Sequence, residues 1–565
     1  MKIPQRSFGN GYWHVEDCER NALTKSYWPA DESTKLLDTT VSQVLISAAK
    51  NFPDRYFLVE GIANSEKRRR WTYAQTLKQA KKIASALLTR FKPGDHIAIW
   101  APNVPEWVFI ELGCALAGMV IVTIIPANQE TELRHIVESA NVSCIFVLEE
   151  YRGRSLIDIA NRIKTECACL KEVVGFSELE SFVAAGNEIN ELPEVYPRSP
   201  LMVMFTSGTT GKPKGVVLHN MGIINGCVAG LDRAGFEEGG VYINSIPMSH
   251  MGGCAIATIG VLAKHGTQVI LNSFDSELML KLFEEEKGTF TSLVPTMVEA
   301  MLNHPKFNDY DLSSFKSFIL GGANVPAELV EKANFMFNAR AAVSFGQTET
   351  HGVMSGTHAD DSLEDQYKTV GQPIPNCEVK IADINTGEIL PIGFVGEICC
   401  RGFNTMLRYE KMPEETAKVL KEDGWLHLGD LGSMDDRGFI KVTGRINDLI
   451  IRGGENIDAS EIENLLKQDS RVSQAVVVGI EDKYWGEEVH VVIVPSNCGG
   501  VLEANELYEF CDAHLAHFKV PRYWYFEEQI PMTHSGKIQK MTIKEYIKTG
   551  KYRVAAIFKN SQNCI

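Results

Sequence analysis

Apolar residues in the first third of the chain follow two alternating spacings. In some segments they recur every three or four positions, which is typical of helices with one buried face. Such helices are predicted at residues 41–53, 74–90, 105–117 and 154–162. Between them lie short, uninterrupted apolar runs, which favour strands buried on both faces. These strands are predicted at residues 96–100, 120–125 and 142–148. Because helices and buried strands alternate, we expect an α/β fold with a parallel sheet covered on both faces.

From residue 378 onward, glycine-rich turns separate shorter strands, which indicates a small β-rich region. These strands are predicted at residues 378–381, 395–400 and 439–443. After the polar stretch GRIND at 444–448, a compact α+β pattern begins, with predicted helices at 460–468 and 502–515 and predicted strands at 474–478 and 490–494. We therefore expect a large α/β body with the β-rich region at residues 1–446, and a small C-terminal domain at residues 447–565. The acidic, proline-spaced residues 175–200 are expected to form a surface connection.

The composition fits a large globular protein and argues against a general nucleic-acid binder. Hydrophobic residues make up 44% of the 565 positions, so the chain can bury a large core. The net charge is −16, whereas nucleic-acid binders usually carry a basic field. The one tight basic run, KRRR at 67–70, favours a solvated loop. A phosphate or lipid contact is the alternative for this run, so peripheral membrane contact stays open.

The cysteines and the termini indicate no disulfide framework and no targeting signal. Thirteen cysteines in this length are too few for a disulfide scaffold, and Cys399-Cys400 lacks the CxxC spacing of a zinc or redox site, with no histidine pair to complete one. We expect free, buried thiols. The apolar stretch at 112–127 is shorter than the roughly 20 residues that a membrane span needs, and fits a buried helix and strand better. With no apolar signal core and no lipidation box, the expected location is cytoplasmic.

A polar loop between two apolar strands carries the first chemical signal. Residues 201–205 and 216–218 read as strands, and TSGTTGKPKG at 206–215 joins them. Its four hydroxyls, three glycines and two lysines supply close backbone approach, donors and charge for phosphate oxygens. An ordinary hairpin turn is the alternative, but tight hairpins need only two to five residues. The loop is not a Walker motif, because GxxxxGK[ST] is absent and a strand follows it.

The segment MFTSGTTGKPKGVV resembles the phosphate-loop signature of the adenylate-forming superfamily, which includes acyl-CoA synthetases, luciferase and peptide-synthetase adenylation domains. Further matches follow in the family's order over nearly the whole chain. They are GGA at 321–323, SFGQTE at 344–349, GWLHLGD at 424–430, GR at 444–445 and PMTHSGKIQK at 531–540. The sequence departs from the family at Phe345, where tyrosine is usual, at Leu428, where threonine is common, and at Asn447, where aspartate or lysine is usual.

The resemblance implies a site for ATP and Mg²⁺. Implied ATP-binding residues are Thr206, Ser207, Gly208, Thr209, Thr210, Lys214, Gly322, Ala323, Phe345, Gly346, Gln347, Thr348, Asp430 and Arg445. Among them, Asp430 is expected to bind the ribose hydroxyls. Glu349 is expected to hold Mg²⁺, a hard cation that prefers carboxylate and phosphate oxygens.

The resemblance also implies the catalytic, acid-binding and CoA-binding residues. The implied catalytic residues are Lys537, Thr206, Glu349 and His250, the implied acid-binding residues are His250, Met251, Gly321 and Gly322, and the implied CoA-binding residues are Gly453 and Gly454. Lys537 is expected to stabilise the charge that builds at the α-phosphate. Asn447 is the expected hinge for a domain rotation between two half-reactions. His250 is interpreted as a gating ring, with a catalytic base as the alternative.

Taken with the resemblance, these residues predict an acid:CoA ligase that forms acyl-AMP and pyrophosphate from ATP, then a thioester with CoA. Positioning and charge neutralisation suffice for this chemistry, which fits the absence of a GxSxG nucleophile motif. Apolar neighbours of His250 favour an uncharged, medium-length aliphatic or aryl acid. The alternatives are a ligase that loads a carrier-protein phosphopantetheine, a non-catalytic nucleotide-binding protein, and a kinase or other NTPase.

Overall fold

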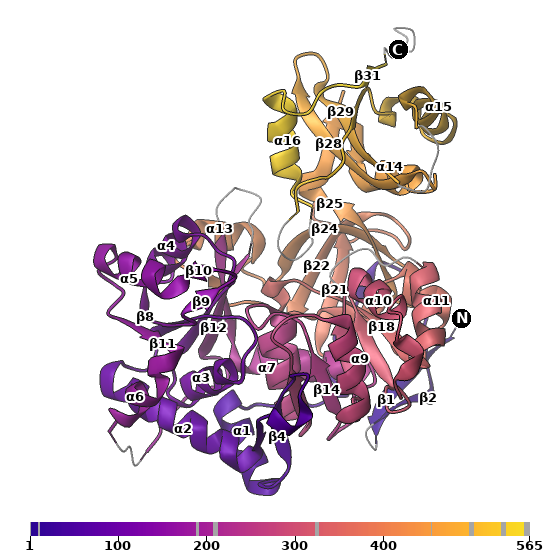
Figure 1. Ribbon diagram of the computed structural model, residues 1–565. Helices are drawn as coiled ribbons and strands as arrows, with labels where there is room; N and C mark the ends of the chain where they lie inside the picture. Colours follow the sequence, from indigo (N-terminus) through magenta and orange to yellow (C-terminus); the bar gives the residue numbers. More distant parts are fainter. Residues whose placement is uncertain are drawn as a thin grey trace.

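The computed structural model describes residues 2–9, 12–187, 191–206, 213–321, 327–453, 455–496, 502–532 and 538–558. Figure 1 shows a broad body and, above it, a smaller lobe formed by the chain from β26 (Leu449–Arg452) onward. The body holds two large sheets and a smaller antiparallel one. This is the mixed α/β architecture that the alternating pattern predicts.

The first sheet is parallel over most of its width and ends in an antiparallel hairpin. In spatial order its strands are β11 (Glu172–Gly175), β8 (Val142–Val147), β6 (His96–Trp100), β7 (Val120–Ile124), β12 (Pro200–Thr206), β13 (Lys214–His219) and β23 (Arg408–Tyr409). The pairings from β11 to β12 are parallel, and β13 pairs antiparallel with both β12 and β23. The predominantly apolar strands β7 and β8 are buried along their whole length, as expected for strands covered on both faces.

The second sheet is parallel in its centre and antiparallel at its edges. In spatial order its strands are β20 (Gln372–Pro373), β19 (Ser355–Gly356), β18 (Arg340–Phe345), β17 (Ser317–Leu320), β16 (Phe290–Leu293), β14 (Val241–Asn244), β15 (Thr267–Ile270), β4 (Tyr56–Glu60) and β5 (Arg70–Thr72). The pairings from β18 to β4 are parallel. The carboxyl ends of these strands therefore meet at one edge, where open α/β sheets bind their ligands.

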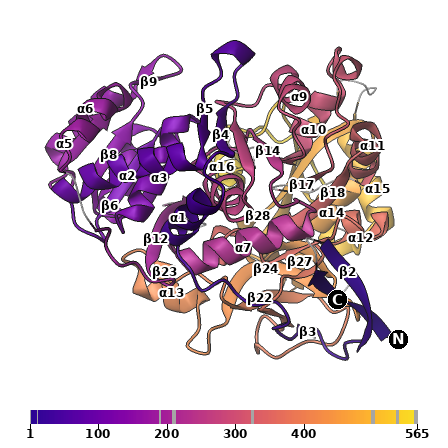
Figure 2. The same ribbon diagram turned by 90° about the horizontal axis from the view of Figure 1, so that it is seen from below.

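Helices cover both sheets and fill the space between them. They are α1 (Val41–Asn51), α2 (Tyr73–Arg90), α3 (Pro105–Leu116), α4 (Glu130–Ser139), α5 (Leu156–Glu166), α6 (Leu179–Ala184), α7 (Asn220–Arg233), the π-helix η3 (Met251–Gly260), α8 (Val261–Ala263), α9 (Ser276–Glu285), α10 (Pro295–Leu302), α11 (Ala327–Phe337), α12 (Leu363–Lys368) and α13 (Pro413–Val419). Short 3₁₀ turns are η1 (Ser65–Lys67), η2 (Phe176–Glu178), η4 (Phe307–Asp309) and η5 (Thr348–Thr350). Figure 2 shows α1 and α7 running between the two sheets, and the largest apolar cluster joins both sheets through these helices.

Local sequence explains where the first two helices begin. Thr40 and Thr72 each accept a hydrogen bond from the backbone three residues on, at Gln43 and Gln75. Each glutamine side chain in turn accepts from the threonine backbone N–H. These two capping boxes satisfy N–H groups that a helix start otherwise leaves without partners.

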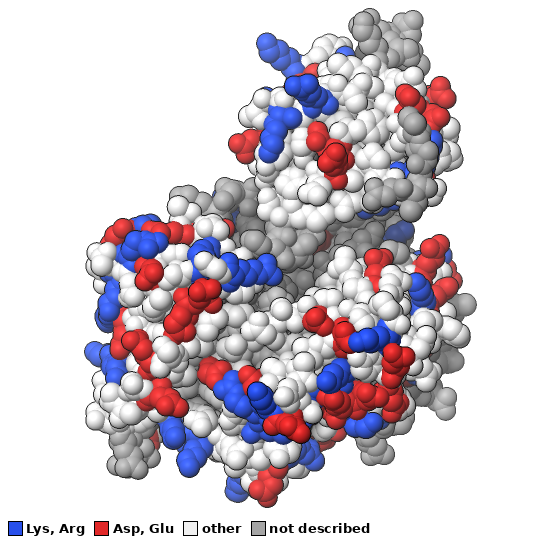
Figure 3. Space-filling view, in the orientation of Figure 1, with Lys and Arg blue, Asp and Glu red and all other residues white. Residues whose placement is uncertain are grey.

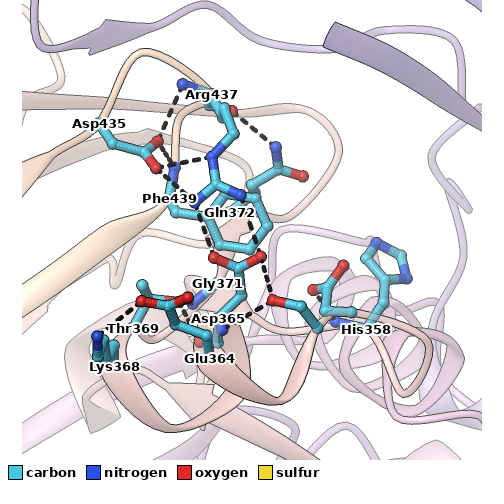
Figure 4. A network of polar contacts seen from close by, with 12 residues as sticks. His358, Glu364, Asp365, Lys368, Thr369, Gly371, Gln372, Asp435, Arg437 and Phe439 are labelled. Atoms are coloured by element: carbon cyan, nitrogen blue, oxygen red, sulfur yellow. Dashed lines mark hydrogen bonds and ion pairs between the residues drawn. The ribbon is translucent and has the colours of Figure 1, made fainter.

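The β-rich region is an antiparallel sheet bound to the body by a polar network. In spatial order its strands are β25 (Ile440–Arg445), β24 (Leu426–Met434), β22 (Gly396–Gly402), β21 (Cys377–Ala382) and β3 (Tyr27–Trp28). Arg437, in the turn between β24 and β25, contacts Asp365 of α12 at 2.7 Å and Asp435 at 2.8 Å, and its backbone carbonyl accepts from Gln372 (Figure 4). The network therefore fixes one end of this sheet against the second body sheet. Two further ribbons pair β1 (Lys2–Gly9) with β2 (Tyr12–Asn21) and β9 (Glu150–Tyr151) with β10 (Arg154–Ser155).

The smaller lobe has its own sheet and its own apolar clusters. Its strands are β27 (Glu455–Asp458), β26, β29 (Gly486–Pro495), β30 (Tyr523–Phe526), β31 (Ala556–Ile557) and β28 (Val472–Asp482), which pairs with β29. Its helices are α14 (Ala459–Leu466), α15 (Ala504–His514) and α16 (Lys540–Lys548), with 3₁₀ turns η6 (Ile446–Asp448) before it and η7 (His517–Lys519) within it. The buried members of its two clusters run from Ile450 to Tyr552, so the hydrophobic core is interrupted near the start of the lobe.

Two interpretations of surface segments need correction. Residues 175–200 are more than a surface connection, because α6 lies within them and buries Leu179 and Phe182. The basic run at 67–70 is not simply a solvated loop, because the Arg68 side chain is fully buried between Glu285 and Glu286. Arg69 and Arg70 also pair with glutamates, so carboxylates within the protein pair with all three arginines of this run. The spacing along the chain could not show these partners, which lie on another helix or strand.

The remaining surface and core features agree with the composition. Acidic and basic side chains are interspersed over the face shown in Figure 3. Each cysteine whose side chain the structure describes is free, and all but Cys169 are buried. In the described part of the chain, no helix combines the length and the apolar character needed to cross a membrane. The apolar stretch at 112–127 forms the end of α3 and the strand β7, as predicted.

Candidate active site

The phosphate-loop segment lies in the hairpin of the first sheet. Thr206 ends β12 and pairs directly with Lys214, the first residue of β13. The Lys214 ammonium lies 2.8 Å from Oε2 of Glu415 and 5.1 Å from the ring centre of Tyr409. Hydrogen bonds from Lys214 and Lys418 lower the pKa of Glu415 to about 2. The lysine is therefore fixed at the base of the loop by a carboxylate from α13.

The SFGQTE segment leaves the second sheet at the end of β18 and turns sharply. An added Cβ at Gly346 would lie 2.4 Å from the carbonyl oxygen of Gly352, so no larger residue fits this close approach. The turn continues into η5, with Thr348 and Glu349 half-buried. The side-chain amide of Gln347 donates to Oδ2 of Asp430 at 2.6 Å. The segment is thereby joined to the β-rich sheet.

Asp430 is held in a bulge of β24 by two donors. It lies opposite Arg445 of the neighbouring strand β25, and the Nε of Arg445 lies 2.9 Å from Oδ1 of Asp430. The side-chain amide of Gln347 donates to Oδ2 of Asp430. The Asp430 side chain is only 4% exposed, but the Arg445 side chain is about half exposed. Gly429, with φ +68°, forms the bulge, and its N–H donates to Oε1 of Glu397 at 3.2 Å. The arrangement presents one oriented carboxylate next to one exposed guanidinium.

Glu349 is fixed from the edge of the first sheet. Its Oε1 accepts a 2.9 Å hydrogen bond from the hydroxyl of Tyr409, and its carbonyl accepts from the Met406 N–H at 2.8 Å. Tyr409 belongs to β23, which pairs with β13 beside Val216. Burial, with the nearby Glu349 carboxylate, raises the pKa of Tyr409, so the phenol stays protonated and donates. The second carboxylate oxygen of Glu349 is not used by this bond.

Two buried histidines, His219 and His351, pack next to the turn that carries Glu349. His351 has a left-handed backbone, with φ +53°. Its Nε2 accepts from the His219 N–H at 3.1 Å, so its Nδ1 carries the proton toward the carbonyl of Asn404 at 3.0 Å. Burial lowers the pKa of both imidazoles, that of His219 to about 4. Gly222 makes room for the ring, because an added Cβ there would lie 2.5 Å from Nε2.

Residues that the resemblance assigns to the acid lie close to the turn that carries Glu349. Met251, the first residue of η3, is buried, and its Cε would lie 3.2 Å from a Cβ added at Gly352. His250 is exposed and caps η3, accepting from the Gly252 N–H at 3.3 Å. Gly321 follows β17, where an added Cβ would come within 3.3 Å of the Ser344 carbonyl. Met251 and Gly321, two of the residues assigned to the acid, therefore lie beside the segment 344–352.

Comparison with protein families identifies the chain. The profile described as AMP-binding enzyme matches residues 45–410, and the profile described as AMP-binding enzyme C-terminal domain matches residues 461–537. The chain belongs to the AMP-binding enzyme family. It is an adenylate-forming enzyme of the acyl-CoA synthetase type.

Relatives of this AMP-binding enzyme cover most of the chain. It is 32% identical over 540 residues to a putative acyl-CoA synthetase, YngI, of Bacillus subtilis, covering 90% of this chain and 97% of that protein. It is 32% identical over 556 residues to the mitochondrial medium-chain acyl-CoA ligase ACSF2 of Mus musculus, covering 92% and 89%.

Solved structures share the fold. ATP-bound MatB from Rhodopseudomonas palustris superposes with a TM-score of 0.80 at 24% identity, covering 90% of this chain and 99% of that one. An o-succinylbenzoate CoA synthetase from Bacillus subtilis, in complex with its acyl-adenylate, gives a TM-score of 0.77 at 26% identity, with coverage of 90% and 99%. The predicted fold class is confirmed.

Several residues that the sequence assigns to the site lie outside the described part of the AMP-binding enzyme. They are Ser207, Gly208, Thr209, Thr210, Gly322, Ala323, Gly454 and Lys537. Asn447 lies in η6 immediately before the smaller lobe. Gly453 follows β26 with φ +61°, and an added Cβ would lie 3.0 Å from Trp485. The roles of all these residues stay predictions.

Sequence reasoning missed the residues that hold the site together. Tyr409 and Glu415 fix Glu349 and Lys214 but belong to no motif, and they lie far along the chain from their partners. His219 and His351 are likewise unmarked by spacing. Because sheet pairing brings these side chains into place, only the three-dimensional arrangement reveals them.

Proposed function

We propose that this enzyme activates an apolar carboxylic acid with ATP, releases pyrophosphate, and transfers the acyl group from acyl-AMP to CoA. The observation that carries the proposal is the arrangement of Gln347, Asp430 and Arg445. An oriented carboxylate beside an exposed guanidinium suits the vicinal hydroxyls of ribose and a neighbouring phosphate. Gln347, which orients this carboxylate, lies within the segment that the AMP-binding enzyme profile matches.

The chain's own residues account for adenylation without an enzyme nucleophile. The acid carboxylate attacks the α-phosphate, and the bond to pyrophosphate breaks. Thr206 and Lys214 at the loop base supply donors for phosphate oxygens, and Lys537 is proposed to neutralise the charge that develops at phosphorus. The thiolate of CoA then attacks the acyl carbon and AMP leaves. His250, exposed at the start of η3, is proposed to gate the acid site; its hydrogen bond to Gly252 engages Nδ1 in capping.

Glu349 fits a magnesium ion. Its carboxylate is half-buried and oriented by Tyr409 through one oxygen, which leaves the other for a hard cation. When bound, Mg²⁺ would neutralise phosphate charge and orient the departing pyrophosphate. Tyr409 would set the angle at which Glu349 presents its oxygen.

We propose that the smaller lobe, from residue 447, rotates between the two half-reactions. The interruption of the core supports a hinge at Asn447, because few apolar contacts resist motion there. Gly453 and Gly454 are proposed to reach the CoA arm after rotation. The left-handed backbone at Gly453, packed against Trp485, favours glycine at this position.

A medium-length apolar acid is the proposed substrate. The residues that follow His250 form a π-helix that buries Met251, Cys254, Ala255 and Ile256. No charged side chain lies within η3. The name of the mouse relative, a medium-chain acyl-CoA ligase, supports the same class at 32% identity.

Product analysis by mass spectrometry tests the proposal. The purified chain would receive ATP, Mg²⁺, CoA and a panel of straight-chain, branched and aryl acids. We expect acyl-CoA of medium-length acids with one AMP per thioester. Acyl-AMP without acyl-CoA would instead indicate a carrier-protein acceptor, and ADP as product would exclude adenylation.

A lysine variant tests the half-reactions separately. Lys537→Ala should abolish acyl-AMP formation but leave ATP binding within about threefold, because the lysine acts mainly on the developing charge. Lys548→Ala, an exposed lysine of α16, is the matched control. Unchanged turnover in Lys537→Ala would remove that lysine from the mechanism.

A further inference from the structure

Three metal-ligating side chains lie together on two neighbouring inner strands of the β-rich sheet, β22 and β24. Glu397 and Cys399 are two residues apart on β22, so they share one face. His427 of β24 pairs directly with Cys399. Its Nδ1 lies 2.6 Å from Oε2 of Glu397 and 3.5 Å from Sγ of Cys399, and all three ligand atoms lie within 4.8 Å of one another.

The cluster is closed on one side and open on the other. Cys399 is buried against Ala382, Trp425 and the half-buried Tyr27. The side chains of Glu397 and His427 retain 13% and 21% exposure, so a small ion can approach from their side. Burial and the nearby Glu397 carboxylate raise the pKa of the Cys399 thiol, so without a metal the sulfur stays protonated.

The spacing suits a tetrahedral ion with nitrogen and sulfur ligands. Zinc bonds of about 2.0–2.3 Å place nitrogen and sulfur about 3.5 Å apart, which is the separation found here. The same geometry needs roughly 3.3 Å between nitrogen and oxygen, so Glu397 must withdraw by somewhat less than 1 Å from His427. A thiolate disfavours Mg²⁺ and Ca²⁺ and selects softer ions.

We propose that Glu397, Cys399 and His427 form a binding site for one zinc-class divalent cation, with water as the fourth ligand. As the zinc–sulfur bond forms, the thiol proton leaves to solvent, because a coordinating thiol is deprotonated by the ion's charge. No zinc motif is evident in the sequence at Cys399-Cys400, because spacing along the chain does not show which residues strand pairing brings together. Here the pairing of β22 with β24 places His427 beside Cys399.

The site is joined to the bulge that carries Asp430. Between the pairs Glu397↔Leu431 and Cys399↔His427 the register shifts, and the extra residues on β24 include Gly429 and Asp430. Glu397 uses Oε1 to hold the Gly429 N–H and Oε2 to contact His427. When Oε2 of Glu397 moves to bind a metal, the same carboxylate changes its hydrogen bond to the Gly429 N–H, and the bulge that carries Asp430 must shift. Zinc binding therefore changes nucleotide affinity, a consequence that rests on the proposed role of Asp430, whereas zinc binding itself does not.

Metal binding is measured first on the full chain, stripped of metal and without nucleotide. Equilibrium dialysis against Zn²⁺, followed by elemental analysis, should give one tightly held zinc per chain. Cys399→Ser and His427→Gln should each weaken it by about tenfold or more. Cys169→Ser and His304→Gln, which lie elsewhere in the body, are the controls. Zinc binding that is equal in all four variants would overturn the site.

Cobalt spectroscopy on the unaltered chain avoids reliance on variants that fold poorly. Co²⁺ should produce a thiolate-to-cobalt charge-transfer band in the near ultraviolet, and Zn²⁺ should displace it. Bound cobalt without this band would exclude Cys399 as a ligand. Calorimetry with AMP, which chelates zinc less than ATP, tests the coupling: the AMP dissociation constant should shift when zinc is bound, and not in Cys399→Ser. An unchanged constant in the unaltered chain would overturn the coupling.

Discussion

The hydroxyl of Tyr409 donates a 2.9 Å hydrogen bond to Oε1 of Glu349, although 60 residues separate them. The contact exists because the short strand β23 pairs with β13, the strand that follows the phosphate-loop segment. One tyrosine therefore links the first sheet, with its Lys214, to the turn that leaves the second sheet. Its ring also lies beneath the Lys214 ammonium. The carboxylate proposed to hold Mg²⁺ is oriented from outside its own motif.

Tyr409→Phe should lower kcat/KM by about tenfold while leaving the fold intact. A hydrogen bond to a charged group contributes about 1.5–3 kcal/mol, and its loss lets the Glu349 side chain rotate. The loss should appear as a higher Mg²⁺ requirement in steady-state kinetics. Tyr27→Phe, which removes a tyrosine–carboxylate bond to Glu378 in the β-rich sheet, is the matched control. Equal kinetics in the two variants would show that Tyr409 does not position Glu349.

The sequence predicts the body well because its signals are local. The periodicity that predicted helices at 41–53 and 74–90 and a strand at 96–100 reflects burial of one face or both, and the structure has α1, α2 and β6 there. Gln347, Asp430 and Arg445, which belong to three of the motifs that resemble the family, also lie in contact with one another. What the sequence could not give are contacts made by strand register, such as Cys399 beside His427. Such contacts depend on which strands pair and in what register, and the number of residues between two strands does not indicate either.

Gly222→Ala should destabilise the protein by about 1–3 kcal/mol and reduce activity. The new Cβ would lie 2.5 Å from Nε2 of His351, and that ring is enclosed between His219 and Asn404. Relief of the overlap must move the ring, and with it the turn that carries Glu349. Thermal unfolding and the KM for ATP measure the two effects.

Gly226→Ala, one turn further along α7, is the control for this substitution. An added Cβ there meets the His351 carbonyl oxygen at 3.5 Å, an ordinary contact. Because alanine also favours helix over glycine by up to about 1 kcal/mol, this variant should be at least as stable as the unaltered chain. If both variants lost stability equally, the effect would belong to the helix and not to the histidine.

The smaller lobe should lose stability as the pH falls from about 6.5 toward 4. Burial, with Arg522 nearby, lowers the pKa of His490 to about 4, and its ring stacks on Tyr523 at 4.2 Å. An unfolded histidine titrates near 6.5, so between these values the unfolded chain binds a proton that the folded lobe does not. The stabilisation is complete above about pH 6.5, and about 1.4 kcal/mol is lost per pH unit below it. Urea-unfolding midpoints at pH 7 and pH 5 measure the change.

His490→Gln should flatten this part of the pH dependence, because glutamine does not titrate. His514→Gln replaces an exposed histidine of α15 in the same lobe and should keep the slope of the unaltered chain. A slope that persists in His490→Gln would assign the pH dependence to other groups.

Lys540→Gln should slow adenylation more than thioester formation. The half-buried Lys540 ammonium lies 2.9 Å from Oε1 of Glu463 and 3.4 Å from Oδ2 of Asp448. Burial alone would lower the pKa of Lys540, but the two carboxylates outweigh it and raise the pKa, so the ion pair persists at neutral pH. This lysine therefore ties the start of α16 to the residue that follows the proposed hinge. Because the segment before α16 carries Lys537, releasing the tie should misplace the adenylation lysine.

Two half-reaction assays separate this effect from a general loss of folding. Acyl-AMP formation from acid and ATP should fall by about tenfold in Lys540→Gln, an energy of about 1.4 kcal/mol. Thioester formation from supplied acyl-AMP and CoA should change much less, since Lys537 is not proposed to serve that step. Lys544→Gln, one turn along α16 and 3.9 Å from Glu487, is the matched control. An equal loss in both half-reactions would mean that Lys540 maintains only the fold of the lobe, because a positioning role must discriminate between the two steps.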